Sequence, residues 1–138
     1  MGLYKNSVPV SKRKADAERV LLKYPDYIPV IIDKSEEISK LITKQKFLVP
    51  RNVSCVHLLN TIRIMSNNKI NPSQALFLFC NNILVMPQDS IDYLYTKYKD
   101  KEDNYLYVYV CYENTFGNQH LKAIANITTD INPNNNPV

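Results

Sequence analysis

The hydrophobic positions near the start of the chain follow a helical period. Apolar side chains recur at i, i+3, i+4 and i+7 from Ala17 to Tyr24, and Pro25 ends the pattern. Ser11 is placed to cap this helix at its N-terminus. We therefore expect an amphipathic helix whose charged face meets solvent. That charged face carries Lys12, Asp16, Arg19 and Lys23.

The same period recurs in two later segments. Residues 55–65 repeat apolar side chains at helical spacing, which predicts a helix with one face packed on a sheet. Residues 91–98 form a shorter amphipathic segment that Asp89 and Ser90 can cap. Both helices are expected to cover apolar strands.

Four segments have the composition of β-strands. They are residues 27–33, 47–50, 76–80 and 105–112. Pro29 cannot donate to a strand ladder, so by itself it predicts an edge position for the first strand. The second strand is short and ends in Pro50, which also suits a sheet edge. Asn81 and Asn82 suit a tight turn that needs positive φ.

The predicted elements follow the order helix, strand, strand, helix, strand, helix, strand. This order indicates an α+β domain. Residues 34–46 are too many for a hairpin loop, so some local structure is expected there. A β-grasp topology is compatible with the order, but the pattern alone does not select it over other α+β folds.

Composition is typical of one small intracellular domain. The chain has 138 residues, of which 45% are hydrophobic, and this is enough for a single core. It contains no apolar run long enough to span a membrane and no secretory hydrophobic stretch at its start. The three cysteines lack metal-ligand spacing, so we expect reduced and mostly buried thiols, with no metal and no cofactor.

The positive charge is concentrated at the N-terminal end. Residues 1–24 hold six basic residues against two acidic ones, and the rest of the chain holds eleven of each. A basic segment of this kind can meet an acidic partner or anionic lipid. A solvated helix face is an equally good interpretation.

A single glycine follows the last predicted strand. Gly117 comes directly after Phe116 and is the chain's only glycine apart from Gly2. Residues 118–138 resemble a loose tail, with low-complexity asparagines near the end. An aromatic-glycine pair followed by a removable tail is typical of a ubiquitin-like modifier precursor, although an ordinary turn glycine would give the same local pattern.

Several sequence blocks together resemble the GABARAP / light chain 3 family of ubiquitin-like autophagy modifiers, over roughly residues 10–117. The blocks are Tyr24-Pro25, Ile28-Pro29-Val30-Ile31-Ile32, Lys46-Phe47-Leu48-Val49-Pro50, Asn81-Asn82, Leu106-Tyr107 and Thr115-Phe116-Gly117. The resemblance implies a ubiquitin-like β-grasp fold, with a four-stranded mixed sheet crossed by a helix and preceded by N-terminal helices. It divides the chain into an N-terminal helical subdomain (1–26), a ubiquitin-like domain (27–117) and a C-terminal tail (118–138). It also implies a central first strand, against the inference from Pro29 alone.

The chemistry that this resemblance implies is performed on the chain by other proteins. A cysteine protease would cut after Gly117, and activating and conjugating enzymes would carry its carboxyl group as thioesters. The carboxyl group would then form an amide with phosphatidylethanolamine, which moves a cytoplasmic protein onto the autophagosome membrane. Glycine suits this role because it has no Cβ to obstruct narrow active sites. The chain itself is not expected to be an enzyme.

The resemblance also implies capture of receptor and adaptor peptides by strand addition at residues 46–50. A peptide of the aromatic-x-x-aliphatic type would use two pockets, with Lys44 and Lys46 as flanking basic contacts. The aromatic pocket would comprise Asp16, Val20, Pro29, Ile31, Lys46, Leu48 and Tyr105. The aliphatic pocket would comprise Phe47, Val49, Pro50, Leu58 and Ile62. Val20, Tyr105, Thr61 and Met65 depart from the residues that are common in the family.

Two other functions fit parts of the sequence. The basic helix and the tyrosine-rich strand could bind single-stranded nucleic acid, although no aromatic-glycine RNA-binding signature is present and the resemblance implies no nucleic-acid partner. A cysteine enzyme could pair Cys55 with His57, or Cys111 with His120. Residues two apart on a helix point in different directions, which disfavours the first pair. His120 lies in the predicted tail, which disfavours the second.

Overall fold

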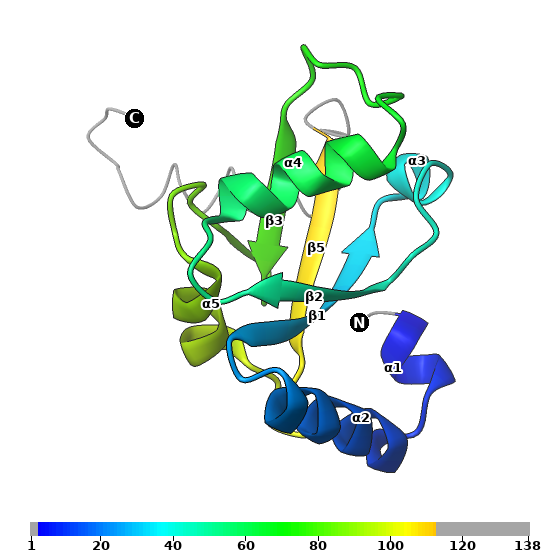
Figure 1. Cartoon of the computed structure of the whole chain (residues 1–138). Coiled ribbons are helices and arrows are strands. Elements are labelled where there is room, and N and C mark those ends of the chain that lie inside the picture. Colours follow the sequence, from blue (N-terminus) through cyan, green and yellow to red (C-terminus); the bar gives the residue numbers. More distant parts are fainter. Residues whose placement is uncertain (1–2, 113–138) are drawn as a thin grey trace, which may run out of the picture.

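The computed structural model describes residues 3–112, which form a mixed five-stranded sheet with helices on both faces (Figure 1). The sheet order is β2-β1-β5-β3-β4, with β1 and β5 parallel and the other neighbours antiparallel. The strands are β1 (Tyr27–Lys34), β2 (Lys46–Pro50), β3 (Leu76–Cys80), β4 (Ile83–Leu84) and β5 (Leu106–Tyr112). The helices are α1 (Leu3–Ser7), α2 (Val10–Lys23), α3 (Glu36–Ser39), α4 (Cys55–Met65) and α5 (Ile91–Tyr98).

This arrangement confirms the predicted α+β, ubiquitin-like class. Figure 1 shows α4 crossing the sheet over β3 and β5, while α1 and α2 lie beyond β1. The prediction of four strands missed β4, because its two residues show no period. The local structure expected within residues 34–46 is α3.

Local turn and capping chemistry fixes several element ends. Ser90 caps α5, as predicted, since its hydroxyl accepts the Tyr93 N–H at 3.0 Å. Asn81 and Asn82 make the turn between β3 and β4 with φ of 50° and 65°. The predicted cap at Ser11 is wrong. Helix α2 begins at Val10, and the Pro9 carbonyl accepts the first helical hydrogen bond, from Arg13 N–H at 3.0 Å.

The edge position inferred from Pro29 alone is also wrong, because β1 lies between β2 and β5. The Ile32 N–H donates to Gln45 O of the β2 side, and the Ser35 N–H donates to Val110 O of β5. Even positions of β1 therefore face β2 and odd positions face β5. The β5 ladder begins opposite Val30, so Pro29 lies just outside it and removes no strand-to-strand bond.

The buried face of α2 differs from the predicted one. Arg13, Asp16 and Ala17 are its buried residues, whereas Tyr24 remains exposed. Asp16 was expected on the solvent face. Charged side chains can be buried here because each finds an oppositely charged partner, as described below.

Two hydrophobic clusters hold the helices onto the sheet. The main cluster lies on the α4 side and includes Val30, Leu58 and Leu106. The smaller cluster lies on the α2 side and joins Tyr4, Ala17, Ile31 and Tyr105. Within residues 3–112, no helix is long and apolar enough to cross a membrane.

Candidate peptide-binding groove

Strand β2 leaves one edge of the sheet open. It is the terminal strand in the sheet order, and within residues 3–112 its only strand neighbour is β1. Phe47 and Val49 stand opposite even-numbered β1 residues, so their backbone groups face β1. The N–H and C=O groups of Lys46 and Leu48 therefore point outward, where an extended peptide could pair with them.

The residues predicted for the aromatic pocket come together on the α2 side of this edge. The strand register sets Ile31 opposite Lys46 and Pro29 opposite Leu48. Asp16 reaches the same place from α2, with its Oδ2 atom 4.0 Å from Lys46 Nζ. Ile31 and Tyr105 are 0% and 3% exposed, so they form a buried floor, and Leu48 at 39% forms part of an open rim. The seventh residue, Val20, is partly buried one helical turn after Asp16.

Charge at the pocket mouth is balanced around Asp16. Arg19 donates to Asp16 Oδ1 at 2.9 Å, and Lys12 Nζ lies 3.4 Å from Oδ2. The hydrogen bond from Arg19, followed by the charges of Lys12 and Lys46, lowers the pKa of Asp16 against the opposing effect of burial. The carboxylate is therefore ionised at neutral pH, and Lys46 remains half exposed beside it.

Tyr4 is a pocket neighbour that the sequence did not predict. Its ring meets the Tyr105 ring edge-on, with centroids 5.8 Å apart, and Lys46 Nζ lies 6.0 Å from its centre. Helix α1 holds it there, since Lys5 forms an ion pair with Asp100. Five helical residues are too few for a periodic signal, so no sequence pattern could have indicated this contact.

The residues predicted for the aliphatic pocket belong mostly to the main core. Val49, Leu58 and Ile62 are 5%, 1% and 1% exposed, and Phe47 packs on them while partly exposed. Pro50 stands opposite Tyr27, so strand alternation assigns it to the α2 face, away from the other four. Of the five residues, only Phe47 and Pro50 therefore remain partly exposed for a peptide side chain to contact. Lys44 covers the Phe47 ring with its ammonium group, 5.1 Å from the centroid.

A buried ion pair positions α2 against the pocket floor. Arg13 Nη1 donates to Asp103 Oδ2 at 3.2 Å, and the Tyr107 hydroxyl donates to the same carboxylate. Asp103 Oδ1 accepts the Tyr105 N–H at 2.9 Å. Burial, followed by the bond to Asp103, raises the pKa of Tyr107, so its hydroxyl keeps its proton. This network joins α2 to the segment that carries Tyr105 and leads into β5.

The structure gives little support to the two alternative functions. Lys5 and Arg13 of the basic segment form internal ion pairs with Asp100 and Asp103, so these two cations are not available to bind phosphate groups. Cys55 is buried, and burial raises the pKa of its thiol to about 12, which is the wrong direction for a nucleophile. Cys111 is buried as well, and the three cysteines are free thiols as expected. The cleavage junction Phe116-Gly117 and the predicted partner His120 lie outside the described residues.

Known proteins of one kind match this chain. A family model described as "Autophagy protein Atg8 ubiquitin like" matches residues 12–117. Autophagy-related protein 8 of Mycosarcoma maydis is 39% identical over 115 residues, which cover 83% of this chain and 95% of that protein. The protein of the same name from Coccidioides immitis is 38% identical over 116 residues and is covered to 97%.

Solved structures agree. The crystal structure of Trypanosoma brucei ATG8 superposes with a TM-score of 0.73 at 28% identity, covering 82% of this chain and 96% of the other. Plasmodium falciparum Atg8, solved in complex with a Plasmodium falciparum Atg3 peptide, superposes with a TM-score of 0.66 at 32% identity, covering 80% and 95%. The residues matched by the family model include all five strands and most of α2.

Proposed function

Because this chain belongs to the Atg8 family of ubiquitin-like autophagy proteins, we propose that it is a modifier joined to phosphatidylethanolamine through Gly117. The observation that carries the proposal is the family match, which runs to residue 117 and stops there. Residues 118–138 would be removed first. Residues 1–26 and 27–117 would remain as the helical subdomain and the ubiquitin-like domain.

The proposed reaction sequence transfers one acyl group. A cysteine protease hydrolyses the peptide bond after Gly117 and frees its carboxyl group. An activating enzyme then uses a nucleoside triphosphate to remove one carboxyl oxygen and joins the acyl group to its own thiol as a thioester. The acyl group passes to a thiol of the conjugating enzyme, and the lipid amine displaces that thiol to form an amide. A residue without Cβ allows the amine to reach the carbonyl from either side. The chain supplies the acyl group and a docking surface, and the catalytic groups belong to its partners.

Lipid attachment would decide where the protein resides. It would be cytoplasmic before conjugation and would sit on the autophagosome membrane afterwards. A single covalent lipid with two acyl chains is sufficient for stable anchoring.

The open edge of β2 supports a second part of the proposal, the capture of receptor and adaptor peptides. An extended peptide would pair with the outward N–H and C=O groups of Lys46 and Leu48. Its aromatic residue would enter the pocket floored by Ile31 and Tyr105, and its aliphatic residue would press on Phe47. Acidic residues beside these anchors would find Lys44 and Lys46. The Atg3 peptide bound to Plasmodium falciparum Atg8 supports the conjugating enzyme as one such partner.

Replacement of Gly117 tests the modifier proposal. In cells, Gly117→Ala should leave a folded protein that keeps its tail and gains no lipid, as read by mass spectrometry. A chain that ends at Gly117 serves as the control, because it bypasses the protease and should still gain the lipid. A normal phospholipid adduct on Gly117→Ala would contradict the proposal. So would a native protein that is never found ending at residue 117.

A further inference from the structure

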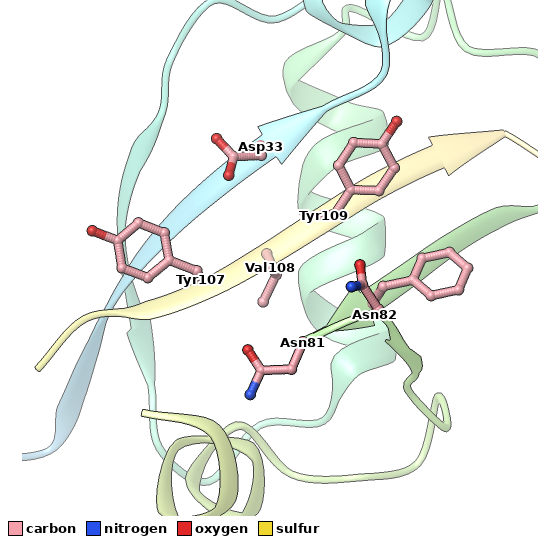
Figure 2. A pocket seen from close by; sticks show the side chains of 7 residues that line it. Asp33, Asn81, Asn82, Tyr107, Val108 and Tyr109 are labelled. Atoms are coloured by element: carbon pink, nitrogen blue, oxygen red, sulfur yellow. The ribbon is translucent and has the colours of Figure 1, made fainter. Parts of the chain in front are cut away.

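A second hollow lies on the sheet away from the peptide groove. It has a volume of about 280 Å³ and lies beside the middle of β5 (Figure 2). Figure 2 shows Asp33 of β1 beside Tyr107 and Tyr109 of β5, with Asn81 and Asn82 of the β3–β4 turn across the hollow. The register places Asp33 directly opposite Tyr109. A carboxylate, two phenol rings and two amides therefore share one concave site.

Asp33 is a half-buried carboxylate whose ion pairing differs from that of its acidic neighbours. Asp16, Asp100 and Asp103 each have a basic partner. Within residues 3–112, no ion pair and no side-chain hydrogen bond involves the Asp33 carboxylate. The charge of its sequence neighbour Lys34 favours the ionised carboxylate, but the Lys34 ammonium group donates to Ile32 O and Lys44 O and forms no ion pair with it. Burial nevertheless raises the pKa of Asp33, so a further cation in the hollow would stabilise its charged form.

Next to the hollow, a carboxylate and a tyrosine ring already hold a cation together. Lys5 Nζ is paired with Asp100 and lies 4.9 Å from the centre of the Tyr107 ring. The carboxylate and the ring face together hold that ammonium group. Asp33 and the Tyr109 ring repeat the same pair of acceptors one step further along β5, and the amide oxygens of Asn81 and Asn82 can add hydrogen bonds.

We propose that the hollow at Asp33 binds an arginine side chain presented by another protein. Charge complementarity selects a cation, and a planar guanidinium can bond to the Asp33 carboxylate while its face stacks on the Tyr109 ring. The guanidinium bonds to the Asp33 carboxylate and stacks on a tyrosine ring. The site lies across β1 and β5 from the open edge of β2, so a partner can use it together with the peptide groove or alone.

An NMR titration of the isotope-labelled full chain tests the proposal. The probe is Nα-acetyl-arginine amide, and Nα-acetyl-citrulline amide is its neutral match of nearly the same shape. We expect saturable shifts at Asp33, Asn81, Asn82 and Tyr109 with the arginine probe and much smaller ones with citrulline. Asp33→Asn should weaken the arginine affinity about fivefold, which corresponds to one partly exposed ion pair.

Asp26→Asn is the matched control, because Asp26 is an exposed carboxylate that forms no ion pair within residues 3–112. The Asp26→Asn variant should bind Nα-acetyl-arginine amide with the same affinity as the unaltered chain. Equal shifts with citrulline would overturn the proposal, and so would an Asp33→Asn variant that binds arginine normally. Shifts confined to the region of Asp16 would also overturn it, since they would assign the arginine to the peptide groove.

Discussion

The Arg13 guanidinium and the Asp103 carboxylate form a buried ion pair although 90 positions separate them. The two side chains are 6% and 0% exposed, and the Nη1–Oδ2 distance is 3.2 Å. The pair joins α2 to the segment that leads into β5. Since α2 carries Asp16 and that segment carries Tyr105, one buried contact aligns two walls of the candidate groove.

Removal of Arg13 should therefore be costly. We expect Arg13→Met to lower the free energy of unfolding by about 3 kcal/mol or more, because Asp103 is left buried without a counter-ion. Urea unfolding measures the change. Lys14→Met, an exposed position on the same helix, should change stability by less than about 0.5 kcal/mol. Equal effects of the two substitutions would show that the pair does not hold α2 in place.

The Tyr95 hydroxyl should act as a substitute for the N–H that Pro29 lacks. If the β1–β5 register is extended beyond its first pair, a backbone N–H at position 29 would face the Asn104 carbonyl. The Tyr95 hydroxyl donates to that carbonyl at 2.8 Å. Tyr95→Phe should lower the free energy of unfolding by about 1 kcal/mol. In a Pro29→Ala background, the restored N–H can supply the bond, so the loss should shrink.

A double-mutant cycle of these two positions measures the coupling. Tyr93→Phe is the control, because Tyr93 lies on the same helix and is 49% exposed. If Tyr95→Phe lowers the free energy of unfolding equally in the chain with Pro29 and in the Pro29→Ala variant, the Tyr95 hydroxyl does not replace the missing N–H donor.

The groove prediction concerns Leu48 and Lys46 on the open edge. Leu48→Ala combined with Lys46→Glu should weaken an aromatic-x-x-aliphatic peptide by roughly 1–3 kcal/mol, because it removes an apolar rim and places a second acid beside Asp16. Isothermal titration calorimetry measures the affinity. Ile83→Ala serves as control, since Ile83 is exposed on β4 at the other edge of the sheet.

The peptide backbone gives an independent check of strand addition. N-methylation at a peptide position that bonds to β2 should abolish binding, and methylation one residue along should be tolerated. An unchanged titration with the Leu48→Ala/Lys46→Glu variant, or equal tolerance of both methylations, would mean that the groove lies elsewhere.

The charge of Asp33 should lower stability at neutral pH. Burial raises the pKa of Asp33, so the folded state binds the proton more tightly than the unfolded state does. This cost is absent at pH 3, where the carboxyl group is protonated in both states, and is fully present above the folded pKa. Asp33→Asn should therefore raise the Tm at pH 7 and change it little at pH 3. The gain should be less than about 1 kcal/mol, because water screens a partly exposed carboxylate.

Asp16→Asn provides the control of opposite sign. The pKa of Asp16 is lowered, chiefly by the bond from Arg19, so its stabilising effect exists above the unfolded pKa and is lost as pH falls through the folded value. This variant should be less stable at pH 7. Thermal melts of both variants between pH 3 and pH 7 measure these effects. Tm shifts of the same sign for the two variants at pH 7 would contradict the opposite roles given to Asp33 and Asp16.

The sequence by itself determined the elements whose causes are local. The periods of α4 and β5, the Ser90 cap and the asparagine turn were all predicted and are all present. The chain is poor in glycine, and each described residue with positive φ is asparagine. Asparagine is among the non-glycine residues that adopt the left-handed region most readily. The family blocks indicated the fold, and the short length and terminal Pro50 of the second strand indicated the edge position of β2. The pocket residues inferred from the family blocks remain predictions.

Only the tertiary structure decided how charges and prolines are accommodated. Pro29 sits in a central strand because its missing donor falls outside the β1–β5 ladder, and the Tyr95 hydroxyl of α5 donates to the carbonyl that this donor would face. Arg13 is buried because Asp103, from a distant part of the chain, forms an ion pair with it. Asp16 is buried because Arg19, one turn further along the same helix, forms an ion pair with it. Tyr4 reaches the pocket through a helix too short to leave a pattern. Periodicity reports the face that one segment presents, whereas burial of a charge depends on which distant residue the fold brings beside it.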